Sequence, residues 1–319
     1  MLMRTAFSLG SPAGAGARLS ILIFHRVLSE PDPLFPAEAD KVSFDMNMRW
    51  VSDWFNVLPL DEAVARLGQG RLPARAAAIT FDDGYTDNLL NAAPILQRYG
   101  LHATFFIASG FLDGGRMWND TLIESVRRAT VTSIDCTVLQ LGQIGVDTIE
   151  AKRSALQRLI PAIKHLLGQQ RTEMVEYVRE ACAASLPQDL MMTSAQLKAL
   201  RDLGMGIGAH TMNHPILAKT PAQVARDEIA SNRDFLEGLL GERIGLFAYP
   251  NGKKDTDYTA EHVEMVRQLG FDAAVTTNWG ACRSTSDRYQ LPRFTPWDTQ
   301  RLRYGVRLLM NLRCPAVRV

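Results

Sequence analysis

The sequence predicts an α/β fold in which parallel strands form a sheet or a barrel. Apolar stretches with strand character alternate with amphipathic stretches of helical character along most of the chain, and this alternation is typical of parallel sheets. The 319 residues fit two domains of average size or one α/β barrel, and 46% hydrophobic residues suffice for a large core. A third observation is the pair Asp82 and Asp83 directly after an apolar run, because active sites of such folds lie at the carboxyl ends of strands.

The first part of the chain contains three expected strands and two expected helices. The runs LSILIFHRV, AAAITF and HATFFIA are rich in apolar, aromatic or β-branched residues, as in buried strands. Asp61 begins a short helical pattern, and Gly100 follows a second one. The strands are expected at 19–27, 76–81 and 102–108, and the helices at 61–67 and 88–99.

The stretch from about 110 to 190 interrupts this alternation. It contains two long helical patterns, at 151–167 and 171–184, and little strand character. We therefore expect a helical insertion in the barrel.

The alternation resumes after the insertion. Thr193 and Gln196 have the spacing of a capping box, and Pro221 suits the first position of a helix. The helices are expected at 193–203, 220–240 and 261–269, and the strands at 205–209, 244–249, 271–276 and 289–294.

Composition and termini narrow the class of protein. A formal charge of +1 gives no argument for a nucleic-acid partner, and no apolar run reaches the length of a membrane span. Residues 1–18 lack a convincing export signal and are expected to be flexible, which favours a cytoplasmic or inner-membrane-associated protein. The basic amphipathic tail 301–319 predicts docking on the domain or, alternatively, peripheral membrane contact. The four cysteines show no paired spacing and are expected to be free thiols.

Two groups of polar residues predict a metal site. Two adjacent carboxylates at the end of a buried strand are costly unless a charge meets them. His210 and His214 follow another strand-like run and, because Pro215 comes next, are expected in a loop. Alone, each motif is more often structural. Together, Asp83, His210 and His214 form a set that leaves positions open on a zinc ion, as in catalytic sites.

These motifs resemble those of a known family. TFDDG at 80–84 and HTMNHP at 210–215 are similar to the first two motifs of the polysaccharide deacetylases, the NodB-like carbohydrate esterase family 4. The resemblance extends over roughly Leu19 to Asp298 and is weakest in the insertion. It implies a distorted (β/α) barrel of about seven units and a hydrolase of carbohydrate metabolism. The implied reaction is metal-dependent removal of N-acetyl, or sometimes O-acetyl, groups from a glycan.

The resemblance also implies roles for individual residues. Asp83, His210 and His214 match the metal ligands, for which Zn²⁺ is the leading candidate, and Asp82 matches the general base. The main chain at Asn251 matches the oxyanion donor. Such a base accepts a proton from a water molecule that the metal has made more acidic.

The chain also departs from the family pattern at two places. The usual arginine of the third motif is missing from FAYPNG at 247–252, and Arg293 in LPRF is the expected substitute for orienting the base. No histidine follows His262, so the usual acid of the last motif is absent as well. An exopolysaccharide-associated branch of the family is similar in carrying this histidine on its first strand, and we therefore expect His25 to be the general acid. The alternative is a structural histidine buried in the barrel.

Two aromatic residues are candidates for a sugar subsite. Tyr249 and Trp279 each offer a flat apolar face of the kind on which a pyranose ring packs. Core packing is the alternative for both.

Three functions remain open at this stage. The leading hypothesis is a metal-dependent deacetylase of an N-acetylated polysaccharide or its glycan precursor, with a role in exopolysaccharide biosynthesis. A non-catalytic glycan-binding protein with the same fold and a C–N hydrolase of a small amide are the alternatives, because the fold alone does not separate them.

Overall fold

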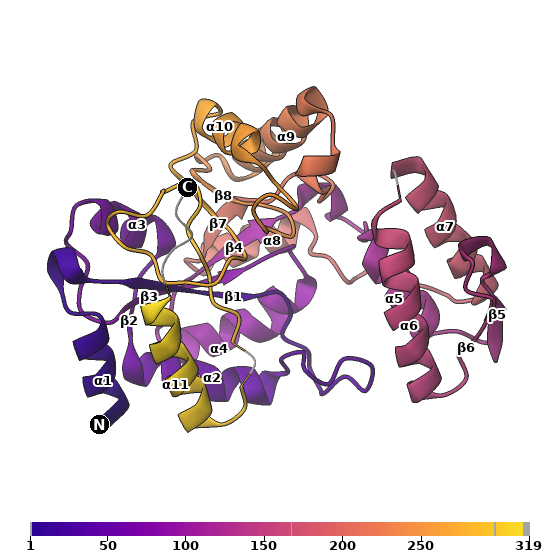
Figure 1. The fold of residues 1–319 in the computed structure, drawn as a ribbon, viewed down its shortest axis with the longest axis horizontal. Coiled ribbons are helices and arrows are strands. Elements are labelled where there is room, and N and C mark those ends of the chain that lie inside the picture. The colour runs from indigo at the N-terminus through magenta and orange to yellow at the C-terminus, as the bar shows by residue number, and fades with distance from the viewer. Residues whose placement is uncertain (1, 167, 297, 315–319) are drawn as a thin grey trace. The chain divides into compact units, whose positions relative to one another are not determined.

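The computed structural model describes residues 2–166, 168–296 and 298–314, which form two compact units (Figure 1). The first unit contains the described residues of Met1–Glu30, Ala37–Asp113 and Met192–Val319, and the second contains those of Pro31–Pro36 and Gly114–Met191. The second unit has bounds close to the expected insertion, and it also includes the short segment Pro31–Pro36, which the sequence did not indicate.

The first unit is built on a parallel sheet of seven strands. Six strands follow one another in the order β1-β3-β4-β7-β8-β9, and β2 also pairs with β3. Every pairing in this sheet is parallel, as the alternation of strands and helices predicted. The strands are β1 (Leu19–Phe24), β2 (Asn56–Val57), β3 (Ala76–Phe81), β4 (Ala103–Ile107), β7 (Gly206–Ala209), β8 (Leu246–Ala248) and β9 (Ala273–Val275).

The segment Leu291–Phe294 closes this sheet into a distorted barrel. Leu291 forms a parallel bridge to Val275 of β9, and Phe294 forms one to Leu22 of β1. The strand expected at 289–294 is therefore present as isolated bridges, because Pro292 has no N–H to give to a continuous ladder. The expected distorted (β/α) barrel is confirmed, with β1 and the closing segment as neighbours.

Helices cover the outside of the barrel, except for α3 (Leu60–Gly68), whose buried residues pack with the interior cluster of strand side chains. Their apolar faces pack against the outward side chains of the strands, including the stacked rings of Phe24, Phe81 and Phe105. The α-helices of the first unit are α1 (Leu2–Gly10), α2 (Lys41–Trp54), α3 (Leu60–Gly68), α4 (Ala93–Arg98), α8 (Ser194–Asp202), α9 (Ala222–Leu240), α10 (Ala260–Gln268) and α11 (Arg301–Arg313). A π-helical turn, η2 (Asn88–Ala92), precedes α4, and short 3₁₀ turns are η1 (Gly14–Gly16), η3 (Ser109–Phe111) and η5 (Leu217–Lys219).

Side chains of the strands alternate between this outer core and the interior of the barrel. On β3, Ala78 belongs to an interior cluster that also holds Ile21 and Phe106, whereas Ile79 and Phe81 belong to the outer core. Because successive side chains point to opposite faces, Thr80 and Asp82 continue the interior row.

The N-terminus differs from the expected flexible segment 1–18. Residues 2–10 form helix α1, whose Phe7 is fully buried between Trp54 and Phe55. Single-sequence patterns missed this helix because its apolar contacts come from distant segments, including α11.

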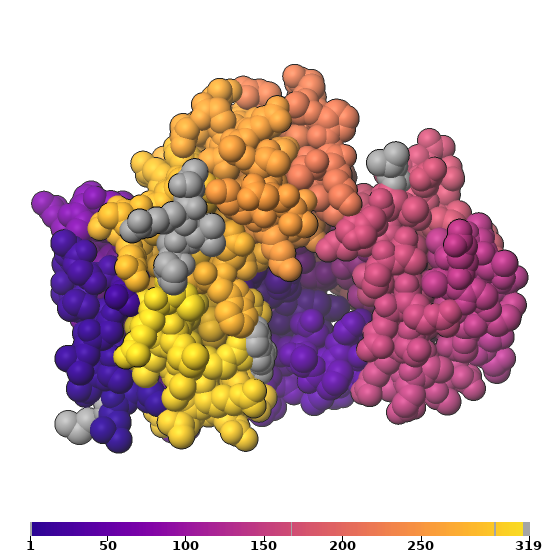
Figure 2. Space-filling model, in the orientation of Figure 1, coloured from indigo at the N-terminus to yellow at the C-terminus, as the bar shows by residue number. Residues whose placement is uncertain are grey.

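The C-terminal helix α11 docks on the barrel beside α1, and the two lie next to each other in Figure 2. Tyr304, Leu308 and Leu312 are buried on its inner face. This is the docking that we expected for the tail, and the alternative of membrane contact finds no support. Residues 315–319 of the predicted tail lie outside the described residues.

The second unit has a core of its own. Three helices pack around a two-stranded antiparallel sheet, and the bidentate pair of Arg127 with Asp32 ties in the segment Pro31–Pro36. Its elements are α5 (Trp118–Arg127), β5 (Ser133–Asp135), η4 (Thr137–Leu139), β6 (Gln143–Gly145), α6 (Ile149–Lys164) and α7 (Gly168–Ala181).

Among the described residues of both units, no helix combines the length and the apolar character that crossing a membrane requires.

Replacing Phe7 by alanine tests the packing of α1. Loss of a fully buried aromatic side chain should lower the free energy of unfolding by about 3–5 kcal/mol, measured by urea denaturation. Leu9→Ala in the same helix is the control, because Leu9 is 82% exposed and its replacement should change stability by less than about 0.5 kcal/mol. Equal, small effects of both substitutions would mean that α1 is not docked.

Candidate active site

The candidate site lies where three parallel strands end. Asp82 and Asp83 directly follow β3, His210 directly follows β7, and Pro250 and Asn251 lie just beyond β8. Since the carboxyl ends of parallel strands share one edge of the sheet, residues far apart in sequence meet there.

Sharp backbone turns give these residues their directions. Asp83 has φ 80°, Thr211 has φ 63° and His214 has φ 51°, a left-handed region that non-glycine residues seldom adopt. Gly84 has φ 97°, and a Cβ atom there would stand 3.3 Å from the side chain of Ile107, so this position of the DDG motif requires glycine. Such strained conformations each cost about 1–3 kcal/mol and concentrate at functional sites.

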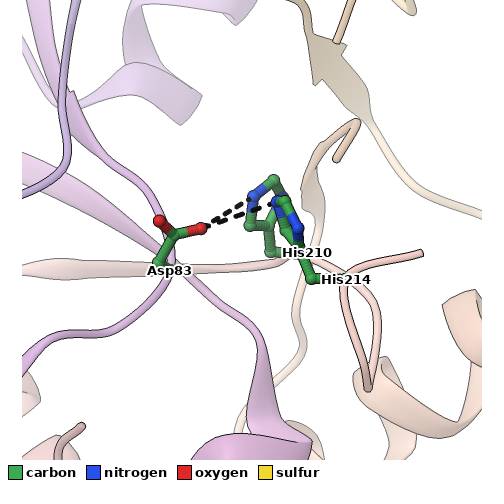
Figure 3. A group of neighbouring side chains, drawn as sticks. All are labelled: Asp83, His210 and His214. Atoms are coloured by element: carbon green, nitrogen blue, oxygen red, sulfur yellow. Dashed lines mark ion pairs between the residues drawn. The ribbon is translucent and has the colours of Figure 1, made fainter. Parts of the chain in front are cut away.

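Asp83, His210 and His214 point toward one another (Figure 3). Oδ1 of Asp83 lies 3.5 Å from Nε2 of His210 and 3.6 Å from Nε2 of His214. Asp83 and His210 are buried, whereas the His214 side chain is 18% exposed. The loop predicted for the two histidines is present, and Oγ1 of Thr211 accepts a hydrogen bond from the His214 N–H.

The geometry of these three side chains fits a divalent metal. Zinc ligands lie about 2.0–2.1 Å from the ion, so two ligand atoms at a tetrahedral angle are about 3.4 Å apart. Oδ1 of Asp83 is buried and has no hydrogen-bond partner among the described residues, and its contacts with the imidazoles are too long to be good hydrogen bonds. Nδ1 of His210 lies 2.7 Å from the Ala248 carbonyl oxygen, to which its N–H can donate. That tautomer leaves the Nε2 lone pair free for a cation.

The electrostatics of the metal-free cluster also favour a cation. Burial would raise the pKa of Asp83, but His210, His214 and His25 together hold it below its ordinary value. Burial lowers the pKa of His214 to about 4, which leaves this imidazole neutral and able to act as a ligand. Burial also disfavours the charged form of His210, but Asp83 and Asp82 outweigh it and raise its pKa. A metal cation between the three side chains would supply the positive charge that a second ring proton on His210 supplies in the metal-free cluster.

Asp82 and Arg293 form a bidentate ion pair inside the barrel. Nη1 and Nη2 of Arg293 donate to the two carboxylate oxygens at 2.7 Å each, and Nε donates to the carbonyl oxygen of Thr276. Arg293 is fully buried and Asp82 is 2% exposed. Burial would raise the pKa of Asp82, but the charges of Arg293 and His210 lower it on balance. The carboxylate is therefore ionised and held in one orientation.

His25 stands next to Asp82 at the same edge of the barrel. Strands β1 and β3 pair in register up to Phe24 and Phe81, and the Asp82 N–H donates to the Phe24 carbonyl oxygen at 3.0 Å. His25 is exposed, which differs from the alternative of a histidine buried in the barrel. Its charged form would lower the pKa values of both Asp82 and Asp83.

The main chain at Asn251 is available as a hydrogen-bond donor. Asn251 has φ 58°, and within the described residues its N–H has no hydrogen-bond partner. Its carbonyl oxygen accepts from Oγ1 of Thr277, which anchors the turn. Gly252 follows with φ 73°, and a Cβ atom there would stand 2.8 Å from the Thr277 nitrogen.

The two expected sugar-subsite aromatics have other surroundings. Tyr249 is fully buried, stacks on Tyr258 and donates its hydroxyl hydrogen to the carbonyl oxygen of Tyr289, so it belongs to the core. Trp279 is 48% exposed, but it contacts the outward ring of Phe294 and lies under Arg307 of α11. These contacts place Trp279 on the outer side of the barrel wall and give a sugar-binding role no support.

Sequence reasoning missed two residues of α9 that hold the histidine loop. Asn232 is fully buried, and its Oδ1 accepts from the His210 N–H while its Nδ2 donates to Ile107 and Ser109. Glu228 accepts two hydrogen bonds from Asn213. The available signal was a polar residue at position 232 in the otherwise apolar stripe of this helix.

A family model described as polysaccharide deacetylase matches residues 69–274, well over half of the chain. The chain belongs to the polysaccharide deacetylase family. This membership implies a hydrolase that acts on an acetylated glycan, and deacetylases of this kind generally use a divalent metal.

One curated protein and two solved structures are similar to this chain over most of its length. YxkH of Bacillus subtilis (strain 168), a protein named after the same family, is 23% identical over 279 residues, which cover 87% of this chain and 71% of YxkH. The Streptococcus pyogenes deacetylase PplD, solved in complex with acetate, has 21% identity and a TM-score of 0.60, with 93% of this chain and 99% of PplD covered. IcaB from Ammonifex degensii has 17% identity and a TM-score of 0.59, with 95% and 99% covered. At these identities the two structures show a shared fold.

Metal binding to this deacetylase-family chain should depend on pH. Because the pKa of His210 is raised, zinc must displace a proton from this imidazole at pH values below that pKa. The apparent affinity should then fall about tenfold per pH unit as the pH decreases, measured by competition with a chromophoric chelator. His262→Ala is the control, because His262 caps α10 and is not one of the three residues. Zinc binding that survives in Asp83→Asn with unchanged affinity would contradict the site.

Breaking the Asp82–Arg293 pair should destabilise the protein. Arg293→Met leaves a buried carboxylate without a partner, and the free energy of unfolding should fall by about 3–5 kcal/mol at neutral pH. Arg243→Met, which removes the exposed pair with Asp272, should cost less than about 1 kcal/mol.

The same variant has a predicted pH dependence. In the wild type the lowered pKa of Asp82 adds stability above its unfolded value of about 4, and this contribution is lost as the pH falls through the folded pKa. In Arg293→Met this contribution should be reduced, since burial alone raises the pKa. Parallel stability–pH curves for the two proteins between pH 3 and 7 would contradict this account.

Proposed function

We propose that this protein is a metal-dependent hydrolase that removes N-acetyl groups from an N-acetylated polysaccharide or its glycan precursor. The observation that carries the proposal is the convergence of two groups at one barrel edge. One is the cluster of Asp83, His210 and His214, whose side-chain atoms have a spacing that fits a divalent cation. The other is the carboxylate of Asp82, which Arg293 holds in one orientation.

Asp83, His210 and His214 would hold a divalent metal, with Zn²⁺ the best match for one carboxylate and two imidazoles. When bound, such an ion polarises the acetyl carbonyl and makes a water molecule more acidic. Asp82 is the proton acceptor for that water, because Arg293 holds it in the ionised form and fixes its direction. The N–H of Asn251, which has no partner in the part of the chain that the structure describes, donates to the oxygen that gains negative charge.

His25 is the proposed general acid. Amide hydrolysis expels an amine, which leaves readily only when its nitrogen receives a proton. His25 is exposed, lies beside Asp82 in the strand register, and can therefore reach a substrate that covers the site.

The position of His25 directly after β1 also supports the exopolysaccharide-associated branch of the family. The barrel closes between β1 and Leu291–Phe294. A histidine directly after the first strand therefore lies at the same edge of the barrel as a histidine near the end of the chain would. A non-catalytic glycan-binding protein would have no need of the oriented, buried carboxylate of Asp82.

Acetate release from oligomers of N-acetylglucosamine tests the activity. Zinc-loaded protein should release acetate, and metal-stripped protein should not. Asp82→Asn should lower kcat by about 10²–10⁴-fold, because it removes the proton acceptor. Asp234→Asn, the same substitution at an exposed carboxylate of α9, is the matched control and should leave kcat unchanged.

The outcomes separate the proposed roles. Metal-dependent release that is insensitive to Asp82→Asn would remove Asp82 as the base. Absence of release by zinc-loaded wild type, on glycan oligomers of several lengths, would contradict a glycan deacetylase.

A further inference from the structure

The chain segment that carries His25 is held by side chains rather than by the sheet. Strand β1 ends at Phe24, and the next bridge of this chain segment is that of Leu28 with Asp40. Between them, residues 25–27 have no backbone hydrogen bond to a neighbouring strand within the described residues. Polar groups of this stretch are instead bonded by three side chains that follow the TFDDG motif.

These three side chains bind the backbone of His25 and Val27. Nδ2 of Asn88 donates to the His25 carbonyl oxygen at 2.8 Å. Oδ1 of Asp87 accepts from the Val27 N–H at 3.1 Å, and Nδ2 of Asn91 donates to the Val27 carbonyl oxygen at 2.7 Å. We call Asp87, Asn88 and Asn91 the backbone clamp.

Two residues of the backbone clamp, Asn88 and Asn91, lie in the π-helical turn η2. Their side chains bond neighbouring residues of one segment, His25 and Val27. π-Helical turns are rare and are often found at functional sites. Asn88 is fully buried and Asp87 is 9% exposed, which means that water cannot easily replace their hydrogen bonds.

The residue next to His25 completes the attachment. Nε of Arg26 donates to Oδ2 of Asp87 at 2.8 Å, and the guanidinium lies 4.7 Å from the centre of the Tyr85 ring. The negative charge of the clamp is therefore compensated by the segment that it holds.

We propose that the backbone clamp positions His25 for proton transfer, so that one stretch, Asp82 to Asn91, organises base, metal ligand and acid together. This inference rests on the proposed function of His25 as the general acid. Asp87, Asn88 and Asn91 are positioning residues, since they touch the backbone around His25 and not the substrate. The need for them follows from the exposure of the His25 side chain, which lies outside the packed core.

The step that the clamp serves is protonation of the leaving amine. As the C–N bond of the tetrahedral intermediate breaks, its electron pair goes to nitrogen, and the proton on the His25 imidazolium is transferred to the same nitrogen. A displaced imidazole would slow this step, because proton transfer requires hydrogen-bond distance.

The experiment compares Asn88→Ala with a matched control, Asn311→Ala. Both asparagines are buried, both donate Nδ2 to a backbone carbonyl oxygen, and both have an Oδ1 that lacks a partner among the residues the structure describes. Each zinc-loaded variant is assayed on an N-acetylglucosamine oligomer and on 4-nitrophenyl acetate. The aryl ester has a leaving group that needs no protonation, so its hydrolysis reports on metal and base alone.

Asn88→Ala should lower kcat on the oligomer by about 10–100-fold, as loss of an orienting partner does, and leave the ester rate within about threefold of wild type. His25→Ala should show the same selectivity with a larger loss on the oligomer, of about 10²–10⁴-fold. Asn311→Ala should leave both rates unchanged. Equal losses on both substrates in Asn88→Ala, or none on either, would overturn the proposal.

A second measurement does not depend on glycan activity. Hydrogen exchange of the Val27 amide, followed by NMR on zinc-loaded protein, should accelerate at least tenfold in Asp87→Ala, while amides of β4 remain protected. If the wild type releases no acetate but the Val27 amide behaves in this way, the clamp stands and the proposed function fails. Unchanged exchange of Val27 would overturn the clamp, whatever the activity.

Discussion

The ion pair between Asp82 and Arg293 is the interaction on which the rest of the site depends. It joins the end of β3 to the segment that closes the barrel, and both side chains are almost completely buried. A buried ion pair is costly unless its geometry is good and its remaining hydrogen-bonding groups are satisfied. Here the guanidinium also donates to Thr80 and Thr276. The carboxylate is thus kept ionised and in one orientation beside the cluster of Asp83, His210 and His214.

The strands and the turns of the barrel make different contributions to the site. The barrel strands bring distant residues to one edge, and short strained turns then aim them. Asp83 and His214 both have positive φ angles, and α9 stabilises the histidine loop through Asn232 and Glu228. The strain is tolerated because the surrounding helices and strands are well packed.

Closure of the barrel also accounts for the unusual position of the candidate acid. Phe294 pairs with Leu22, so the first strand and the last segment are direct neighbours. A group at the end of β1 therefore reaches the same space as a group near the end of the chain. The cost of using β1 is that His25 leaves the sheet and needs other partners, which Asn88 and its neighbours supply.

The sequence by itself determined the parallel α/β order, the bounds of β3 and the grouping of Asp83, His210 and His214, because periodicity and short motifs are local signals. It also indicated Arg293 as the partner of Asp82. The third family motif, at 247–252, lacks its usual arginine, and Arg293 was the expected substitute. The sequence could not place Tyr249 in the core, Trp279 outside the barrel, or Phe7 in a docked helix, since burial depends on contacts between distant segments. Only the tertiary structure decided these, together with the side chains that hold His25, because hydrogen bonds across about 60 residues leave no periodic trace in the sequence.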